Sequence, residues 1–409
     1  MKLQTTAALV LACCATLASA QNATGVGKSE IVIGTMQDLS GPLAGYGKAI
    51  RNGMQMRVDE ANEMGGIAGR RIRLIVEDDG YDPKKAVLGA QKLVNRDGIF
   101  AMVGHLGTAP NLAAMPVQFE KNVINFFPIT AAREMYEPSD RLKLANAATY
   151  YDQMRIAAPR LVKDRNIKHP CVIYQDDDFG LEVMRGAEAG LKTLGMNFTE
   201  KTSYKRGATD FSSQVAKMKA AGCEMVVLGT VIRETVGTVA ESRKTGFNPV
   251  FVGSSAVYTD LIPRLGGKLM DGVYSTMTAQ HPYLDAAEQP VRFWANKYKT
   301  KFNEDPSVFS VYGYGNMDSF IRVALKAGPQ LNTDSFVKAL DGMTFNRDMF
   351  GTPELTFSST KHLGNRFSRL SQIQEGRWKV VSDYVAFSGL KPVIQKDGKW
   401  LVQSEFFHD

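Results

Sequence analysis

Short apolar runs of strand length alternate with longer segments of helical periodicity from residue 31 onward. In the first helical segment, Ile50, Met54, Val58 and Ala61 recur at the spacing of one helix face. The pattern predicts strands at residues 31–36, 72–76, 99–103, 123–127, 171–174, 198–204, 225–228, 250–252 and 274–277. It predicts helices at residues 46–63, 82–94, 110–121, 154–163, 182–194, 211–220, 234–244, 288–302, 312–327 and 333–340. Such alternation with short links indicates right-handed crossovers and parallel sheets.

The alternation begins again near residue 150, which predicts an α/β protein with two doubly wound lobes. The helices after residue 288 need a sheet face to cover, and the first lobe has fewer helices than its sheet can use. We therefore assign residues 29–149 and 279–350 to lobe 1 and residues 150–278 to lobe 2. Residues 351–409 should supply C-terminal strands returning to the hinge and lobe 2, and a peripheral tail. A link that is crossed more than once forms a hinge, on which two lobes can close over a ligand.

The N-terminus has the composition of an export signal. Lys2 precedes an apolar run over residues 7–17, and the small residues Ala18-Ser19-Ala20 follow. This order predicts a signal peptide, residues 1–20, that is cleaved after Ala20. A lipoprotein signal at Cys13 is the alternative, although its apolar core would be shorter. No later stretch approaches the ~20 apolar residues that a membrane span needs.

Composition narrows the class of protein. With 44% hydrophobic and 22% charged residues the chain is typical of a globular protein, and its 409 residues suffice for two or three domains. The formal net charge is +7, and the basic residues are scattered rather than clustered. Without a basic run or an interleaved aromatic platform, nucleic acid is not an expected partner.

Two cysteines remain after the predicted cleavage. Cys171 and Cys223 each stand at the start of an apolar, strand-like run. In an oxidising compartment they could form a disulfide across adjacent parallel strands. Two separate buried thiols are the alternative, and the sequence leaves both open.

The stretch from residue 99 to 111 predicts a site for an anion. A buried strand ends at Gly104, a short loop follows, and Thr108-Ala109-Pro110 begins a helix. The free amide groups and positive dipole of a helix start suit a small carboxylate at the carboxyl end of a parallel sheet. Loops around Ile129 and around Ser255 also follow strands, so they should face the same cleft.

Other chemistries find little support in the sequence. The segment 41–48 has one residue too many for a phosphate-binding loop, and Ala49 stands where the magnesium-binding hydroxyl belongs; instead, its Tyr46 should point into the cleft. Consecutive acids such as Asp176-Asp177-Asp178 rarely converge on one ion, and the histidines are dispersed, with His105 expected behind the anion loop. No dinucleotide fingerprint or nucleophile elbow is present. We therefore expect no metal, no cofactor and no catalytic residues.

Several motifs, taken together and in order, resemble the leucine/isoleucine/valine-binding protein family. They are residues 34–42 with 46–47, residues 62–69, residues 78–84 and residues 103–106. The resemblance implies a type I periplasmic binding protein, with two parallel-sheet lobes joined by a three-crossover hinge. It also implies a periplasmic monomer that binds its ligand without chemistry and delivers it to an ABC permease in the inner membrane.

The resemblance also implies roles for individual residues. Thr108 matches the hydroxyl residue that holds the ligand carboxylate together with nearby backbone amides, and Phe179 matches a position that is often aromatic. Three positions depart from the amino-acid receptors: Ser255 replaces an acid, Ala131 a threonine and Val231 a tyrosine. The expected ligand-binding set is Tyr46, Leu106, Gly107, Thr108, Ile129, Thr130, Ala131, Tyr151, Phe179, Val231 and Ser255.

The missing acid bears on the ligand. Enclosing an ammonium group without a carboxylate partner costs several kcal/mol. The sequence therefore favours a small organic acid with an apolar or aromatic body, unless Asp176, Asp177 or Glu234 replaces the acid. A branched-chain amino acid is the first alternative ligand. A ligand-sensing module for a membrane receptor and a cryptic enzyme are alternatives of other classes.

Overall fold

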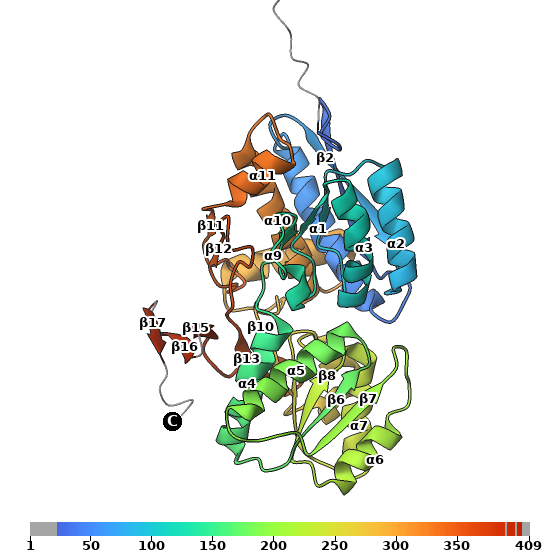
Figure 1. Ribbon diagram of the computed structural model, residues 1–409, viewed down its shortest axis with the longest axis vertical. Coiled ribbons are helices and arrows are strands. Elements are labelled where there is room, and N and C mark those ends of the chain that lie inside the picture. The colour runs from blue at the N-terminus through green and yellow to red at the C-terminus, as the bar shows by residue number, and fades with distance from the viewer. Residues whose placement is uncertain (1–22, 389–390, 397–398, 403–409) are drawn as a thin grey trace, which may run out of the picture.

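The computed structural model describes residues 23–388, 391–396 and 399–402, with side chains described as far as residue 386. The predicted signal peptide, its cleavage site and Cys13 lie outside the described residues. The chain forms two α/β lobes, one above the other in Figure 1. Among the described residues, no helix is both long and apolar enough to cross a membrane.

The sheet of lobe 1 is parallel and has the strand order β2-β1-β3-β4-β5. Its strands are β1 (Glu30–Gln37), β2 (Arg71–Asp78), β3 (Ala101–Val103), β4 (Ile124–Phe126) and β5 (Lys143–Leu144). Alternate residues of β1 face opposite sides: Ile31 and Ile33 belong to the larger core, and Val32 and Met36 to a separate cluster. Both sides of this sheet must therefore be covered by helices.

Helices from distant parts of the chain cover the two faces of this sheet. One face packs against α2 (Pro83–Gln91) and α3 (Thr108–Glu120), which carry the apolar cluster around Val32. The other face is covered by α1 (Ala44–Glu63), α9 (Gln289–Phe302), α10 (Val308–Ala327) and α11 (Thr333–Leu340) (Figure 1). The later helices thus lie against the first lobe, as their apolar stripes predicted.

The contact of α1 with α10 is unusually close. A Cβ atom on Gly53 would lie 2.0 Å from the Ser310 carbonyl oxygen, and one on Gly313 would lie 2.2 Å from that of Ile50. Only glycine permits backbones to approach to this distance. Segments about 260 residues apart are thereby fixed against each other, since Gly53 and Gly313 both lie in this interface.

Lobe 2 contains the larger sheet, with the order β14-β13-β10-β9-β8-β6-β7. Its strands are β6 (Pro170–Gln175), β7 (Glu200–Tyr204), β8 (Met225–Gly229), β9 (Val250–Gly253), β10 (Tyr274–Met277), β13 (Arg369–Gln374) and β14 (Arg377–Val380). Strands β13 and β14 pair antiparallel, so the C-terminal segment extends an otherwise parallel sheet. The helices are α4 (Tyr150–Arg165), α5 (Asp178–Lys192), α6 (Ser212–Ala220), α7 (Ile232–Lys244) and α8 (Leu261–Gly266).

The chain passes between the two sheets between β5 and α4, between β10 and α9, and between β12 (Leu355–Thr356) and β13. The short pair of β12 with β11 (Thr344–Phe345) lies beside the first lobe, where Phe357 stacks on Phe127 at 5.4 Å. Three further antiparallel strands follow, β15 (Val385–Ser388), β16 (Lys391–Lys396) and β17 (Lys399–Val402). The exact lobe limits given above stay a prediction, and the strands of both parallel sheets lie within them.

Cys171 and Cys223 form a disulfide, which is the first of the two alternatives that the sequence left open. Cys171 lies in β6 and Cys223 lies two residues before the adjacent parallel strand β8. The two Cα atoms are 5.8 Å apart, which is within the usual range for a disulfide. The bond lies at the start of both strands, at the opposite end of the sheet from the loops that follow them.

Candidate functional site

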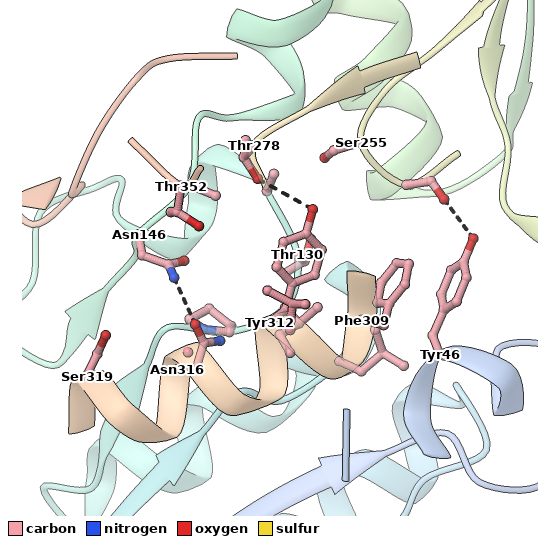
Figure 2. A pocket seen from close by; sticks show the side chains of 18 of the residues that line it. Tyr46, Thr130, Asn146, Ser255, Thr278, Phe309, Tyr312, Asn316, Ser319 and Thr352 are labelled. Atoms are coloured by element: carbon pink, nitrogen blue, oxygen red, sulfur yellow. Dashed lines mark hydrogen bonds between the residues drawn. The ribbon is translucent and has the colours of Figure 1, made fainter. Parts of the chain in front are cut away.

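A cavity of about 160 Å³ lies between the two lobes, where the loops that follow the strands of both sheets meet. Lobe 1 contributes the loops after β3 and β4, and lobe 2 contributes those after β8 and β9. Figure 2 shows the cavity with α10 along one side and Ser255 and Tyr46 at one end. The carboxyl ends of both parallel sheets therefore form one site, as the strand order predicted.

The loop before α3 has the geometry expected of an anion site. Gly104 and Gly107 have φ angles of +62° and +93°, which favour glycine, and Gly107 is the N-cap of α3. The Gly107 amide donates to the Ile129 carbonyl oxygen at 3.1 Å, and Pro110 has no amide hydrogen. The amides of Thr108 and Ala109 are consequently the donors that this helix start can offer to a ligand.

Buried side chains hold this loop in place. Asn111 donates to the carbonyl oxygens of His105 and Gly107, at 2.9 and 2.7 Å. His105 is fully buried behind the loop, as predicted, and its Nε2 lies 3.0 Å from Asp79 Oδ2. Thr108 Oγ1 lies 2.7 Å from Thr130 Oγ1, so the two hydroxyl groups are adjacent at the cavity wall. The loop before α3 is therefore held in its conformation by contacts within the protein.

The wall from lobe 2 is mainly apolar. Phe179, from the first turn of α5, and Val231, which precedes α7, both line the cavity. Ser255 lines it as well, and its amide donates to Gln153 Oε1 at 2.8 Å. The same Gln153 oxygen accepts from Thr276 Oγ1 of β10 at 2.7 Å, so Gln153 of α4 connects the loop after β9 to β10 and holds it in place.

Tyr46 joins the two lobes across the cavity. Its hydroxyl group donates to the Ala256 carbonyl oxygen of lobe 2 at 2.7 Å (Figure 2). Its ring stacks on Phe309 with centroids 3.7 Å apart. Burial raises the pKa of Tyr46 well above its ordinary value, so the phenol stays a neutral hydrogen-bond donor.

All members of the predicted set line the cavity except Tyr151. The Tyr151 ring instead lies under the Arg133 guanidinium, 4.0 Å from its carbon atom. The neighbouring Tyr150 takes the place at the cavity wall and packs edge-on against Phe179, with centroids 5.2 Å apart. Both tyrosines begin α4, where consecutive side chains point about 100° apart, so a one-residue error selects the wrong side of the helix.

Sequence reasoning missed the contribution of α10. Phe309, Tyr312, Asn316 and Ser319 line the cavity from one face of this helix, as Figure 2 shows. Their spacing of three and four residues was visible in the sequence, but it indicates only a shared face and not what that face meets. Other lining residues outside the predicted set include Leu43, Tyr81, Asn146, Ala147, Ala256, Thr278, Phe345, Thr352, Leu355 and Asn365.

Charge is distributed unevenly around the cavity. Within the described part of the chain, its charged lining residues are Asp318, Arg322 and Asp348, all from α10 or the segment after β11. None of the three possible replacements for the missing acid lines the cavity. Asp176 forms an ion pair with Lys205, Asp177 caps α5 and pairs with Arg206, and Glu234 is only 1% exposed in lobe 2. The part of the cavity around Thr108 and Ser255 is therefore uncharged.

Further contacts hold the lobes together at the rim. Arg206 of lobe 2 donates to the Tyr81 carbonyl oxygen of lobe 1 at 3.0 Å, and its guanidinium lies 4.6 Å from the Tyr81 ring centroid. Arg133 of lobe 1 forms a two-pronged ion pair with the buried Glu182 of lobe 2, at 2.7 and 3.0 Å. The structure is thus a closed form of the two lobes.

The described residues contain no group of three or more metal-ligating side chains that could hold a metal ion. Two lobes that enclose a mostly apolar cavity, with the start of a helix at its wall, are typical of a ligand-binding protein. This is the class of protein that the fold and the site support.

Comparisons with known proteins agree with this class. A family model described as "Periplasmic binding protein" matches residues 30–377. The Leu/Ile/Val/Thr-binding protein of Salmonella typhimurium is 28% identical over 264 residues, covering 63% of this chain and 72% of that protein. The Leu/Ile/Val-binding protein of Escherichia coli K12 is 27% identical over 284 residues, covering 68% and 76%.

Solved structures show the same fold. A possible leucine/isoleucine/valine-binding protein from Rhodopirellula baltica superposes with a TM-score of 0.79 at 21% identity, covering 88% of this chain and 98% of that one. A fatty acid ABC transporter substrate-binding protein from Thermomonospora curvata gives the same TM-score and identity, covering 88% and 93%. The chain belongs to the periplasmic binding protein family, so the predicted family, the type I fold and the assignment as a binding protein rather than an enzyme are confirmed.

Proposed function

We propose that this protein is the exported receptor of an ABC importer and captures a small carboxylate by closure of its two lobes. The observation that carries the proposal is the α3 helix start, where Thr108, whose amide is one of the free donors of the first turn, lines a cavity shared by both lobes. The proposed partner is an ABC permease in the inner membrane, and the proposed mature form is a periplasmic monomer that begins after Ala20.

The relatives favour a branched-chain amino acid as the ligand. Two of the similar proteins are named for binding leucine, isoleucine and valine, so this alternative has better support from the comparisons than an organic acid. Leucine would place its carboxylate at Thr108 and its side chain against Ile129, Phe179 and Val231, which line the cavity.

One structural observation favours the second candidate, an organic acid without an ammonium group. Ser255 lines the cavity where the amino-acid receptors of the family are expected to carry an acid, and the surroundings of Thr108 hold no charged side chain among the described residues. An ammonium group enclosed there would lose its hydration without gaining an ion pair, at a cost of several kcal/mol. An apolar or aromatic acid avoids this cost.

The two candidates can be separated with ligands that share one carbon skeleton. Calorimetric titration would compare leucine with 4-methyl-2-oxopentanoate, in which a ketone replaces the ammonium-bearing carbon, and with phenylacetate. Tighter binding of leucine would establish the amino-acid receptor. Tighter binding of the oxo acid or of phenylacetate would establish the organic-acid receptor. If none of these carboxylates binds and the bound ligand proves to lack an acid group, the proposed carboxylate site is wrong.

A further inference from the structure

The cavity continues beyond the site described above, along α10 and towards β11 and β12. We call this extension, lined by Asn146, Gly315, Asn316, Ser319 and Thr352, the annex. We infer that the ligand is elongated: a carboxylate held at Thr108 whose substituent runs along the annex and carries hydrogen-bonding groups, as a short peptide does. The inference rests on the proposed function, and it adds the size and chemical class of the ligand.

The length of the annex follows from the helix that lines it. From Gly315, where the annex begins on α10, to Arg322 at its far end, the helix advances by about 10 Å, at ~1.5 Å for each residue. An extended peptide spans at most about 3.5 Å for each residue, so two to three residues fit along this distance. A single branched-chain amino acid in the cleft would leave the annex empty.

Gly315 shows that the helix itself leaves this space open. A Cβ atom built on Gly315 would have no heavy atom within 4 Å, although the residue lies inside α10. Gly313, two residues earlier, is required for the close approach to α1 described above. Gly315 has no such contact, and a glycine inside a helix makes the helix less stable than alanine would. Close packing therefore does not account for a glycine here, and what distinguishes the position is the free volume beside it. It faces the annex, where a ligand would pass.

The annex differs in chemistry from the rest of the cavity. Its walls carry amide and hydroxyl groups among apolar side chains such as Ala147, Phe345 and Leu355, and Figure 2 shows Asn146, Asn316, Ser319 and Thr352 around it. Asn146 donates to Asn316 Oδ1 at 2.9 Å, and Asn316 donates to the Phe127 carbonyl oxygen at 2.7 Å, so both amides are fixed in orientation. Groups of this kind offer donors and acceptors together, which match the alternating carbonyl and N–H groups of a peptide. A purely apolar chain would offer no partner to the donors and acceptors that remain on these groups beyond their bonds within the protein.

The charges at the far end are already balanced within the protein. Asp318 is paired with Arg57 at 2.9 Å and lies 3.7 Å from Arg322, and Asp348 accepts from the Phe350 and Thr352 amides at 2.9 Å. The outer residues Arg322 and Asp348 are exposed. The annex therefore opens to solvent and favours a neutral substituent of variable length over a second strongly charged group.

The test is a series of probes that share one carboxyl end: 4-methylpentanoate, acetyl-leucine, acetylglycyl-leucine and acetylglycylglycyl-leucine, with decanoate as an apolar chain. Calorimetric titration is carried out on the wild type and on two variants of the full mature chain. Gly315→Leu fills the annex, whereas Gly315→Ala adds only a methyl group and is the matched control. A melting curve for each variant shows that it folds.

We expect the longer acetyl-peptides to bind about tenfold or more tighter than acetyl-leucine, the effect of one or two well-made hydrogen bonds. Gly315→Leu should remove this gain without changing the affinity for 4-methylpentanoate, and Gly315→Ala should keep it. Equal affinity for short and long probes, an equal effect of Gly315→Leu on both, or tightest binding of decanoate would overturn the inference while leaving the carboxylate receptor intact. Failure of every probe, short and long, would count against the proposed function itself.

Discussion

Replacing Arg206 by alanine should shift the protein towards its open form and weaken ligand binding. Arg206 reaches from the loop after β7 across the rim of the cleft to Tyr81, in the loop after β2. Its ion pair with Asp177, at 2.8 Å, stays within lobe 2 and is kept when the lobes separate. The contacts with Tyr81, with a longer-range attraction to Asp82 of lobe 1, are therefore the ones that contribute to closure.

The size of the effect follows from those contacts. The hydrogen bond to the Tyr81 carbonyl oxygen contributes about 0.5 to 1.5 kcal/mol, and the guanidinium over the ring about 0.5 to 1 kcal/mol. Their loss destabilises the closed form by about 1 to 2.5 kcal/mol. If the ligand is held only when the lobes are closed, its dissociation constant rises by up to the corresponding factor, roughly 5- to 70-fold.

The assay is calorimetric titration with the tightest available ligand, combined with the radius of gyration from solution X-ray scattering. Lys205→Ala is a matched control, because Lys205 is adjacent, its side chain is 84% exposed, and its ion-pair partner Asp176 lies in the same lobe. Arg206→Ala should weaken binding and enlarge the ligand-free protein, and Lys205→Ala should do neither. An unchanged dissociation constant in Arg206→Ala, or an equal loss in both variants, would refute the reasoning.

The remaining predictions concern the site and the stability of the chain. Thr108→Ala should weaken carboxylate binding by about 1 to 3 kcal/mol through loss of a hydrogen bond to a charged group, and unchanged calorimetric affinity would exclude the proposed contact. Ser255→Glu supplies an ammonium partner, so leucine should gain about tenfold or more over 4-methyl-2-oxopentanoate in the same titration; no gain would show that position 255 does not face that part of the ligand. Cys223→Ser removes the disulfide bond to Cys171, which closes a loop of 52 residues. The variant should have a free energy of unfolding in urea that is about 4 kcal/mol lower. If dithiothreitol leaves the urea midpoint of the wild type unchanged, the prediction is contradicted. Burial raises the pKa of Glu234, so the native state holds this proton more tightly, and stability is lost as pH rises above the ordinary glutamate range. The unfolding free energy of Glu234→Gln should therefore improve relative to wild type as pH rises above the ordinary glutamate range, and a constant difference would argue against it.

The sequence predicted most of the fold because nearly every helix and strand buries one face. Its errors occur where local conformation depends on tertiary contacts. The strand predicted at 123–127 ends earlier because Phe127 has a φ of +47°, and the two-residue strand β5 has no apolar run to reveal it. The first turn of α4 was missed because it begins with Tyr150 and Tyr151 and a Thr149 cap, before the apolar stripe appears.

The candidate site was predicted only in part for a related reason. Loops that follow parallel strands must gather at one end of a sheet, so Thr108, Ile129 and Ser255 could be placed in one cleft from chain order alone. The α10 wall could not be placed in that way. Tyr312 and Asn316 come from a helix far along the chain, and their periodicity does not distinguish a face against protein from a face against a cavity.

The close contact between α1 and α10 at Gly53 and Gly313 has a consequence for how the chain folds during its synthesis. Gly53 cannot reach its partner Gly313 until all of residues 150–278 have been synthesised, because the intervening segment forms the other lobe. During synthesis the parallel strands of the second lobe come from one contiguous segment, whereas the first lobe stays incomplete with one face of its sheet uncovered. Non-local pairing of this kind also slows folding. The first lobe of a nascent chain of this design therefore remains unfolded for longer, which is the state in which secretion machinery threads a polypeptide across a membrane.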